Sequence, residues 1–210
     1  MLRRSILLAA VLPAPLLLAA PRPAAGGSVL RRPPPGAGRR LRVRHAATGA
    51  AFSGPYHDGR ATDPAAMREL SIVLADHHSG RWRPFDPAAI DILWELGQRE
   101  RMDEFVILSG YRTAATNVAV GGAGDSLHLQ ARALDVQVPT ARLASFGEAA
   151  AALGRGGVGL YPSQGFVHID SGPVRRWGPS GPAGGGRRGT PSTDRVGRIA
   201  EAWAQASRSR

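Results

Sequence analysis

Residues 126–139 read SLHLQARALDVQVP, and the second half of this stretch decides the fold. From Ala131 to Pro139 the side chains alternate in character, which is the period of a β-strand with two unlike faces. One face carries Leu134, Val136 and Val138, and the other carries Ala131, Ala133, Asp135 and Gln137. The pattern therefore predicts a strand that turns its apolar face to a core and holds a carboxylate on the other face.

Further strands and helices are expected on both sides of this strand. Short β-rich runs at residues 105–108, 157–161 and 166–170 predict three strands, with a hairpin-type turn at residues 162–165 joining the last two. Asp63-Pro64 and Asp86-Pro87 are helix-start signals, which predict helices over residues 63–74 and 86–97, the second one stopped by Gly97. Residues 113–120 and 140–153 predict two more, the last capped by Thr140. This order predicts a small α+β domain, an antiparallel sheet with flanking helices.

The glycine- and proline-rich composition of the flanks sets the expected domain limits. Residues 27–55 are rich in proline and arginine and predict an extended linker, with a strand over residues 41–46. The folded domain is then expected at residues 56–178. Residues 179–210 predict a flexible tail that ends in a short helix after Thr193-Asp194. Both flanks are expected to be disordered.

The N-terminus predicts export from the cytoplasm. Arg3 and Arg4 precede an apolar run from Ile6 to Ala20, and small residues follow it, so residues 1–26 are typical of a signal peptide. The paired arginines also fit a twin-arginine signal, although loosely. The run is short and broken by prolines, so we expect no stable membrane span after its removal. The expected location is the periplasm or cell envelope.

The composition excludes several classes of function. The formal net charge is +11, and all 27 basic residues are arginine. No basic amphipathic helix or interleaved aromatic strand accompanies the arginines, so we expect no specific nucleic-acid partner. The chain has no cysteine, so a metal site must use nitrogen and oxygen ligands. No feature of the sequence sets an oligomeric state.

Two of the six histidines stand where chemistry is expected. His128 precedes the strand aspartate Asp135 by seven positions, and His168 lies within the predicted strand at residues 166–170. These three residues could form a three-ligand metal site with a fourth position open, as in catalytic zinc sites. Three such residues arise easily by chance, so spacing alone favours hydrogen-bonded polar residues beside the sheet over a metal site.

Four ordered blocks then resemble a known family. They are the Ser126–Asp135 segment described above, SGYRTAATN at residues 109–117, GGVGLYP at residues 156–162 and FVHIDSGPVRRW at residues 166–177. They resemble the YcbK-like murein endopeptidases, a branch of the zinc D-alanyl-D-alanine peptidases in the lysostaphin and hedgehog superfamily. The resemblance implies one Zn²⁺ ion held by His128, Asp135 and His168, and a peptidoglycan substrate cut in its peptide stems or cross-links.

The resemblance also implies roles for other residues. Arg112 is expected to hold a substrate carboxylate or a tetrahedral oxyanion, and Tyr111, Ser126 and Tyr161 are expected to line the cleft or brace its loops. In related peptidases a glutamate three residues before the last histidine moves protons, but Gly165 stands here. Asp170 is therefore the candidate base, or instead an orienting residue or the cap of the following turn. Ala131 replaces a preferred glycine, which a strand should tolerate.

Two functions remain open at this stage. One is zinc-dependent hydrolysis of peptidoglycan peptides by a murein endopeptidase. The other is a metal-binding domain that recognises peptidoglycan without cutting it, because the expected glutamate is missing.

Overall fold

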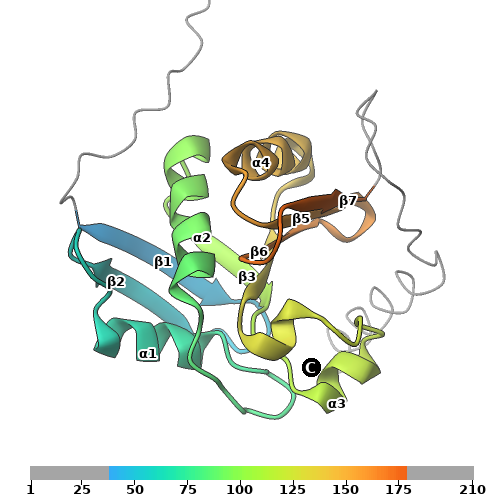
Figure 1. Ribbon diagram of the computed structural model, residues 1–210, viewed down its shortest axis with the longest axis horizontal. Helices are drawn as coiled ribbons and strands as arrows, with labels where there is room; N and C mark the ends of the chain where they lie inside the picture. Colours follow the sequence, from blue (N-terminus) through green and yellow to red (C-terminus); the bar gives the residue numbers. More distant parts are fainter. Residues whose placement is uncertain (1–37, 179–210) are drawn as a thin grey trace, which may run out of the picture. The chain divides into compact units, whose positions relative to one another are not determined.

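The structure is a computed structural model and describes residues 38–178, which form one sheet with helices around it (Figure 1). The strands are β1 (Arg39–His45), β2 (Ala51–His57), β3 (Phe105–Ser109), β4 (Ala133–Gln137), β5 (Gly157–Tyr161), β6 (Phe166–Asp170) and β7 (Arg175–Trp177). Their order in the sheet is β2-β1-β3-β4-β6-β5-β7, with parallel pairing only at β1–β3 and β5–β7 among these strands. The α-helices are α1 (Pro64–Val73), α2 (Pro87–Glu100), α3 (Ala114–Ala119) and α4 (Thr140–Leu153), and short 3-10 helices η1 (Leu127–Gln130) and η2 (Pro162–Gln164) complete the set. The α+β class with a mostly antiparallel sheet is confirmed.

The predicted linker over residues 27–55 is corrected by the first hairpin. Residues 39–45 and 51–57 pair as antiparallel strands, so the folded part begins well before residue 56. In β1 the buried positions Leu41, Val43 and His45 alternate with exposed arginines. The strand expected over residues 41–46 is thus present as β1, two residues longer at its start, whereas its partner β2 was not expected. A strand with one solvated face needs only one apolar residue in two, so the exposed residues between them resembled a linker.

Helices α2 and α4 cover one face of the sheet. A methyl group added at Gly147 of α4 would meet the Leu160 side chain, so Leu160 faces this helix. Gly97 of α2 lies close to the ring of Phe105, where a methyl group would meet the ring at 3.2 Å. The predicted stop of α2 at Gly97 is therefore wrong: this glycine serves close packing, and the helix runs to Glu100 and ends at Arg101, which is left-handed with φ 52°.

The predicted helix starts depend on side-chain caps. Asp63 accepts hydrogen bonds from the backbone of Ala65 and Ala66, and Asp86 accepts one from Ala88, so both Asp-Pro signals are confirmed. Thr140 is not the cap of α4. Pro139 takes that position and makes no side-chain hydrogen bond, and Thr140 is already the first helical residue.

Asp76 fixes the loop that follows α1 to the start of α3. Its Oδ2 accepts hydrogen bonds from the backbone N and the Oγ1 of Thr113, both at 2.8 Å. Burial raises the pKa of Asp76, but the hydrogen bonds from Thr116, Thr113 and His78 outweigh burial and lower this pKa to about 2. The carboxylate is thus charged at neutral pH and holds the two segments together next to Arg112.

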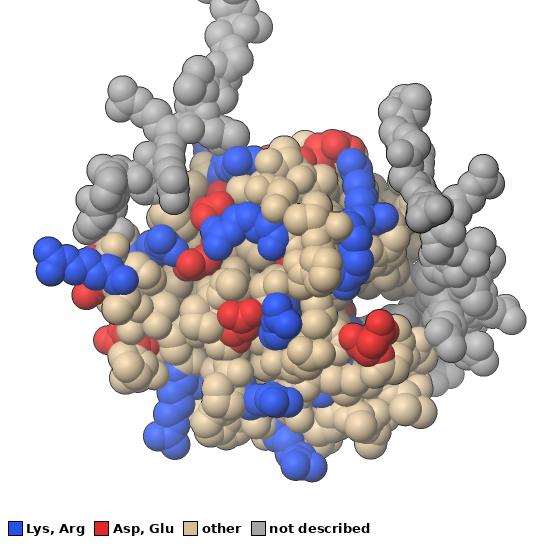
Figure 2. All heavy atoms as spheres, viewed as in Figure 1, with Lys and Arg blue, Asp and Glu red and all other residues tan. Residues whose placement is uncertain are grey.

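On the face of the molecule shown in Figure 2, basic and acidic side chains are interspersed, without a broad area of one sign. At the sheet edges, β2 contains Pro55 and β7 has three residues. No helix within residues 38–178 is long and apolar enough to cross a membrane. The predicted signal peptide and the predicted tail helix lie outside the described residues.

Candidate metal centre

Two paired strands bring the aspartate and one histidine together. Asp135 of β4 lies directly opposite His168 of β6 in the antiparallel register, and paired residues of neighbouring strands share a face. This face is opposite to the one that α2 and α4 cover, because Leu160 pairs with Val167, which has the other parity along β6. Asp135 is thus part of a site on the face of the sheet opposite α2 and α4.

The short helix η1 brings His128 to the same face. It ends at Ala131, whose backbone is left-handed with φ 53°, and the carbonyl of Ala131 accepts a hydrogen bond from the N–H of Asp86. Ala131 was expected to lie in the strand, where an extra methyl is harmless; this expectation is wrong, because β4 starts at Ala133. A left-handed conformation costs a non-glycine residue about 1–2 kcal/mol, which explains why glycine is preferred at this position.

The three predicted ligands converge on one point. His128 Nε2 lies 3.2 Å from Asp135 Oδ1 and 3.2 Å from His168 Nδ1, and the last two atoms are 2.9 Å apart. All three side chains are buried, and within residues 38–178 they form the group suited to a metal ion. Ligand atoms of a tetrahedral zinc ion, at bonds of about 2.0–2.1 Å, are about 3.3 Å apart. The three atoms therefore match the spacing that such an ion requires, with a fourth position left for another ligand.

The backbone of Gly110 fixes the ring of His128. Its carbonyl lies 2.6 Å from His128 Nδ1, so Nδ1 carries the proton and donates it, which leaves the lone pair of Nε2 toward the other two ligands. Burial, followed by the nearby Arg112 guanidinium, lowers the pKa of His128 to about 4. The ring is thus neutral at physiological pH, which is the form that binds metals.

Asp170 does the same for His168. His168 Nε2 lies 3.1 Å from Asp170 Oδ2, and with its proton there the ring presents the Nδ1 lone pair to the site. Asp170 also accepts hydrogen bonds from the backbone of Gly157 and Gly172 and from both terminal nitrogens of Arg175. Burial raises the pKa of Asp170, but the hydrogen bonds from His168, Gly172 and Gly157 outweigh burial and hold this pKa far below its usual value. Of its three expected roles, the geometry favours orienting His168 and capping the turn over acting as a base.

Arg112 is directed at a ligand rather than into open space. Its Nη2 donates to Asp135 Oδ2, and its Nε donates to Ser109 Oγ at 2.7 Å. Its backbone N–H also donates to the carbonyl of His128 at 3.1 Å. Burial raises the pKa of Asp135, but the opposing effects of His128 and Arg112 prevail, so the pKa of this carboxyl lies well below its usual value. Asp135 thus remains an anion, with Oδ1 turned to the two imidazoles.

Sequence comparisons with known proteins place the chain in a family. The sequence profile of the family described as peptidoglycan L,D-endopeptidase MepK matches residues 35–177. The chain belongs to this family. It is 31% identical over 180 residues to the peptidoglycan L,D-endopeptidase MepK of Escherichia coli K12, which covers 80% of this chain and 89% of that protein. It is 32% identical over 148 residues to a probable MepK of Haemophilus influenzae, which covers 66% of this chain and 78% of that protein.

Membership in the MepK family agrees with the corrected start of the domain. The match begins at residue 35 and so includes the β1–β2 hairpin that the sequence alone assigned to a linker. Gly165, where other peptidases carry a glutamate, ends η2 in a left-handed turn with φ 71°. A glutamate there would be strained, so the departure from the glutamate pattern has a backbone cause.

An aromatic wall adjoins His168. The Trp177 ring lies 5.1 Å from the His168 ring, and its Nε1 donates to the Tyr161 hydroxyl at 2.8 Å. Tyr161 in turn stacks on Phe166, with ring centroids 4.4 Å apart. Trp177 lies over Gly159, and a methyl group at residue 159 would overlap the indole. Gly159 of β5 therefore makes room for this wall, a signal that the sequence contained and that was not interpreted.

The other expected cleft residues have more modest positions. Tyr111 is half-buried, packs against the hydrophobic core, and donates its backbone N–H to the carbonyl of Leu74. Ser126 is the residue before η1 and makes no side-chain capping bond, although its carbonyl accepts from Leu129. Ser126 thus braces the loop of His128 through its backbone.

Sequence reasoning missed a polar cluster that joins three segments around the site. Arg132 donates to Asp86 Oδ2 at 3.2 Å and to the carbonyl of Ser171 at 2.8 Å. Ser171 Oγ donates to the same Asp86 oxygen at 2.6 Å. The cluster connects the start of α2, the residue before β4 and the end of β6. No spacing rule relates positions 86, 132 and 171, so only the fold shows that they meet.

Proposed function

We propose that this chain is a zinc-dependent peptidoglycan L,D-endopeptidase that uses His128, Asp135 and His168 as its metal ligands. The observation that carries the proposal is the mutual 2.9–3.2 Å spacing of the three ligand atoms. Membership in the MepK family supports the substrate and the type of bond. A zinc ion held there would supply Lewis-acid polarisation of a peptide carbonyl and make a hydroxide nucleophile available near neutral pH.

The surrounding residues orient the ligand set for metal binding. Gly110 and Asp170 hold the two imidazole protons on the side away from the site, so both rings offer a lone pair. Arg112 occupies the second oxygen of Asp135, which leaves one oxygen for the ion. In this arrangement Arg112 orients a ligand. A substrate carboxylate or an oxyanion nearby would also be attracted by its positive charge.

Tyr161 is suited to donate a hydrogen bond to the reacting carbonyl oxygen. Trp177 already donates to its oxygen, which directs the hydroxyl proton elsewhere. Burial raises the pKa of Tyr161, and the bond from Trp177 reduces this increase only in part. The phenol thus remains a protonated donor at neutral pH, and it belongs to the wall beside His168.

We also propose that the protein acts outside the cytoplasm. Two observations support this proposal. Residues 1–26 have the character of a signal peptide, and the relatives are named as endopeptidases of peptidoglycan. A fusion to a reporter that is active only after export, made with residues 1–26 and without them, tests this point. Equal reporter activity of the two fusions would refute it.

Digestion of purified sacculi tests the activity. The zinc-loaded protein should release new muropeptides, while chelator or the His128→Ala substitution should abolish the release, and added zinc should restore it after the chelator only. Mass spectrometry of the products identifies the bond that is cut. If the protein binds sacculi in a zinc-dependent way but releases nothing, the non-catalytic recognition function applies instead.

A further inference from the structure

A row of side chains crosses the face of the sheet opposite α2 and α4, beside the metal centre. The register pairs Arg44 of β1 with Val106 of β3, Val106 with Gln137 of β4, Gln137 with Phe166 of β6, and Phe166 with Tyr161 of β5. Directly paired residues share a face, so these five residues form one transverse row, here called the shelf. Phe166 and Tyr161 belong to it, and they place the row on the face of the metal centre.

The shelf lies next to the ligands and is exposed at Arg44 and Gln137, whereas Phe166 is buried under its neighbours in the row. Gln137 and Phe166 are each two residues from a ligand on the same strand, Asp135 and His168, which separates the two rows by about 7 Å. Gln137 is exposed and Val106 is half-buried, although both belong to central strands of the sheet. The solvated face of an antiparallel sheet usually carries polar side chains. A row that instead mixes apolar and polar side chains, and that lies beside a candidate site, indicates a surface for a ligand.

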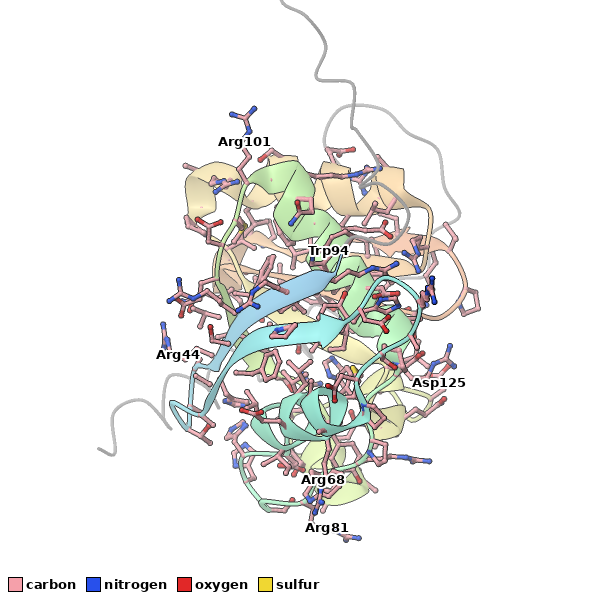
Figure 3. The ribbon with its side chains drawn as sticks, turned by 90° about the vertical axis from the view of Figure 1, so that its left-hand side faces the viewer. Arg44, Arg68, Arg81, Trp94, Arg101 and Asp125 are labelled. Atoms are coloured by element: carbon pink, nitrogen blue, oxygen red, sulfur yellow. The ribbon has the colours of Figure 1, made fainter. Side chains whose placement is uncertain are left out.

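The positive charge of Arg44, at the end of the shelf farthest from the aromatic wall, determines which kind of ligand the shelf could bind. The Arg44 guanidinium is about half exposed and extends from β1 into solvent (Figure 3). Its acid partner is Glu104, at 3.5 Å and equally exposed, which is a weak surface pair. The shelf thus runs from an aromatic wall through an amide to a cation that an anion can reach.

We propose that the shelf binds the peptide arm of the substrate across the strands, with Arg44 pairing to a free carboxylate of that peptide. The proposal rests on the proposed function and extends it to substrate recognition. Two strand spacings and one row step separate Arg44 from Asp135, about 12 Å in all. An extended peptide covers this distance in three or four residues. The carboxylate that Arg44 recognises therefore lies three or four residues from the bond that is cut, within the reach of a short stem peptide.

Peptide binding to the zinc-loaded full-length protein tests the shelf without requiring cleavage. The probes are one stem-type tetrapeptide with its carboxylates free and the same peptide with them converted to carboxamides, titrated by calorimetry. We expect Arg44→Gln to weaken binding of the acid about three- to five-fold and to leave the amide unchanged. Glu104→Gln should have the opposite sign and strengthen binding of the acid about two-fold, because it frees Arg44. A purely structural role of the pair would make both substitutions act alike.

Arg40→Gln is the matched control, since Arg40 lies on the same face of β1 but about 13 Å further from the shelf. Equal effects of Arg40→Gln and Arg44→Gln, or equal binding of acid and amide by the wild type, would overturn the proposal. Self-association that Arg44→Gln abolishes, with no preference for the acid, would assign the row to a second copy of the chain and also overturn it. Failure of the sacculi digestion alone would refute the catalytic function and leave the acid preference to be judged by these titrations.

Discussion

Replacing Asp170 by asparagine should weaken zinc binding without touching a ligand. One oxygen of Asp170 faces two donors, His168 Nε2 at 3.1 Å and an Arg175 nitrogen at 2.8 Å. An asparagine amide group at that place would be a third donor. To recover a hydrogen bond, His168 would move its proton to Nδ1, which is the atom that faces Asp135 and the metal position. The lone pair needed for the ion would then be lost from the stable tautomer.

The size of the effect follows from what such outer partners contribute. Removing a carboxylate that orients a ligand histidine costs about 10- to 100-fold in metal affinity, or about 1.4–2.7 kcal/mol. The zinc-free protein should also lose about 1–3 kcal/mol of stability, because Arg175 keeps its charge and loses its anion. Zinc affinity is measured by competition with a coloured chelator, and the His168 tautomer by long-range nitrogen–proton NMR correlations.

Asp63→Asn is the matched control for Asp170→Asn. Asp63 caps α1 on the surface, where asparagine caps equally well, so zinc affinity and stability should remain close to those of the wild type. The reasoning would be refuted if Asp170→Asn bound zinc as tightly as the wild type. A lower affinity with the His168 proton still on Nε2 would refute the tautomer argument in particular.

Three further predictions concern stability and the aromatic wall. Arg101→Gly should raise the free energy of unfolding by about 0.5–1 kcal/mol in urea titrations, since the residue ends α2 at φ 52°; a loss would contradict this. Asp76→Asn should cost up to about 2 kcal/mol at pH 6, and the difference should fade as the pH drops from about 4 to 2, because the carboxylate with its lowered pKa stabilises the fold only while ionised. A constant difference across that range would show that charge is not the cause. Gly159→Ala should displace Trp177, break its bond to Tyr161 and lower kcat about five-fold at unchanged zinc affinity, with a shift in indole fluorescence; an unshifted spectrum would argue against the overlap.

The strands and helices with local signals could be predicted from the sequence. The alternation in β4 placed Asp135 on the correct face, and the Asp-Pro pairs marked the starts of α1 and α2. The strand predicted over residues 41–46 corresponds to β1, but β2 and the hairpin were missed because the exposed positions of β2 are alanine, serine and proline, which resemble a linker when the partner strand is unknown. Pairing of β1 with β3, about 60 residues later, supplies the context that local patterning lacks.

In the candidate site too, some features could be predicted from the sequence and others could not. Family blocks pointed to the three ligands, and their convergence in the structure agrees with that prediction. The contacts that orient the ligands could not be predicted, since one is a backbone carbonyl, at Gly110, and another depends on the bidentate hold of Arg175 on Asp170. A backbone atom has no signature in the sequence, and the direction of a guanidinium depends on the fold around it.

The two edges of the sheet affect how the protein behaves at high concentration. Pro55 removes one backbone donor from β2, and β7 offers only the few groups of three residues. Neither edge is a good template for adding a strand from another molecule. Concentrated stocks should therefore resist fibril growth through edge-to-edge pairing, and variants of the metal centre can be compared at the millimolar concentrations that NMR requires.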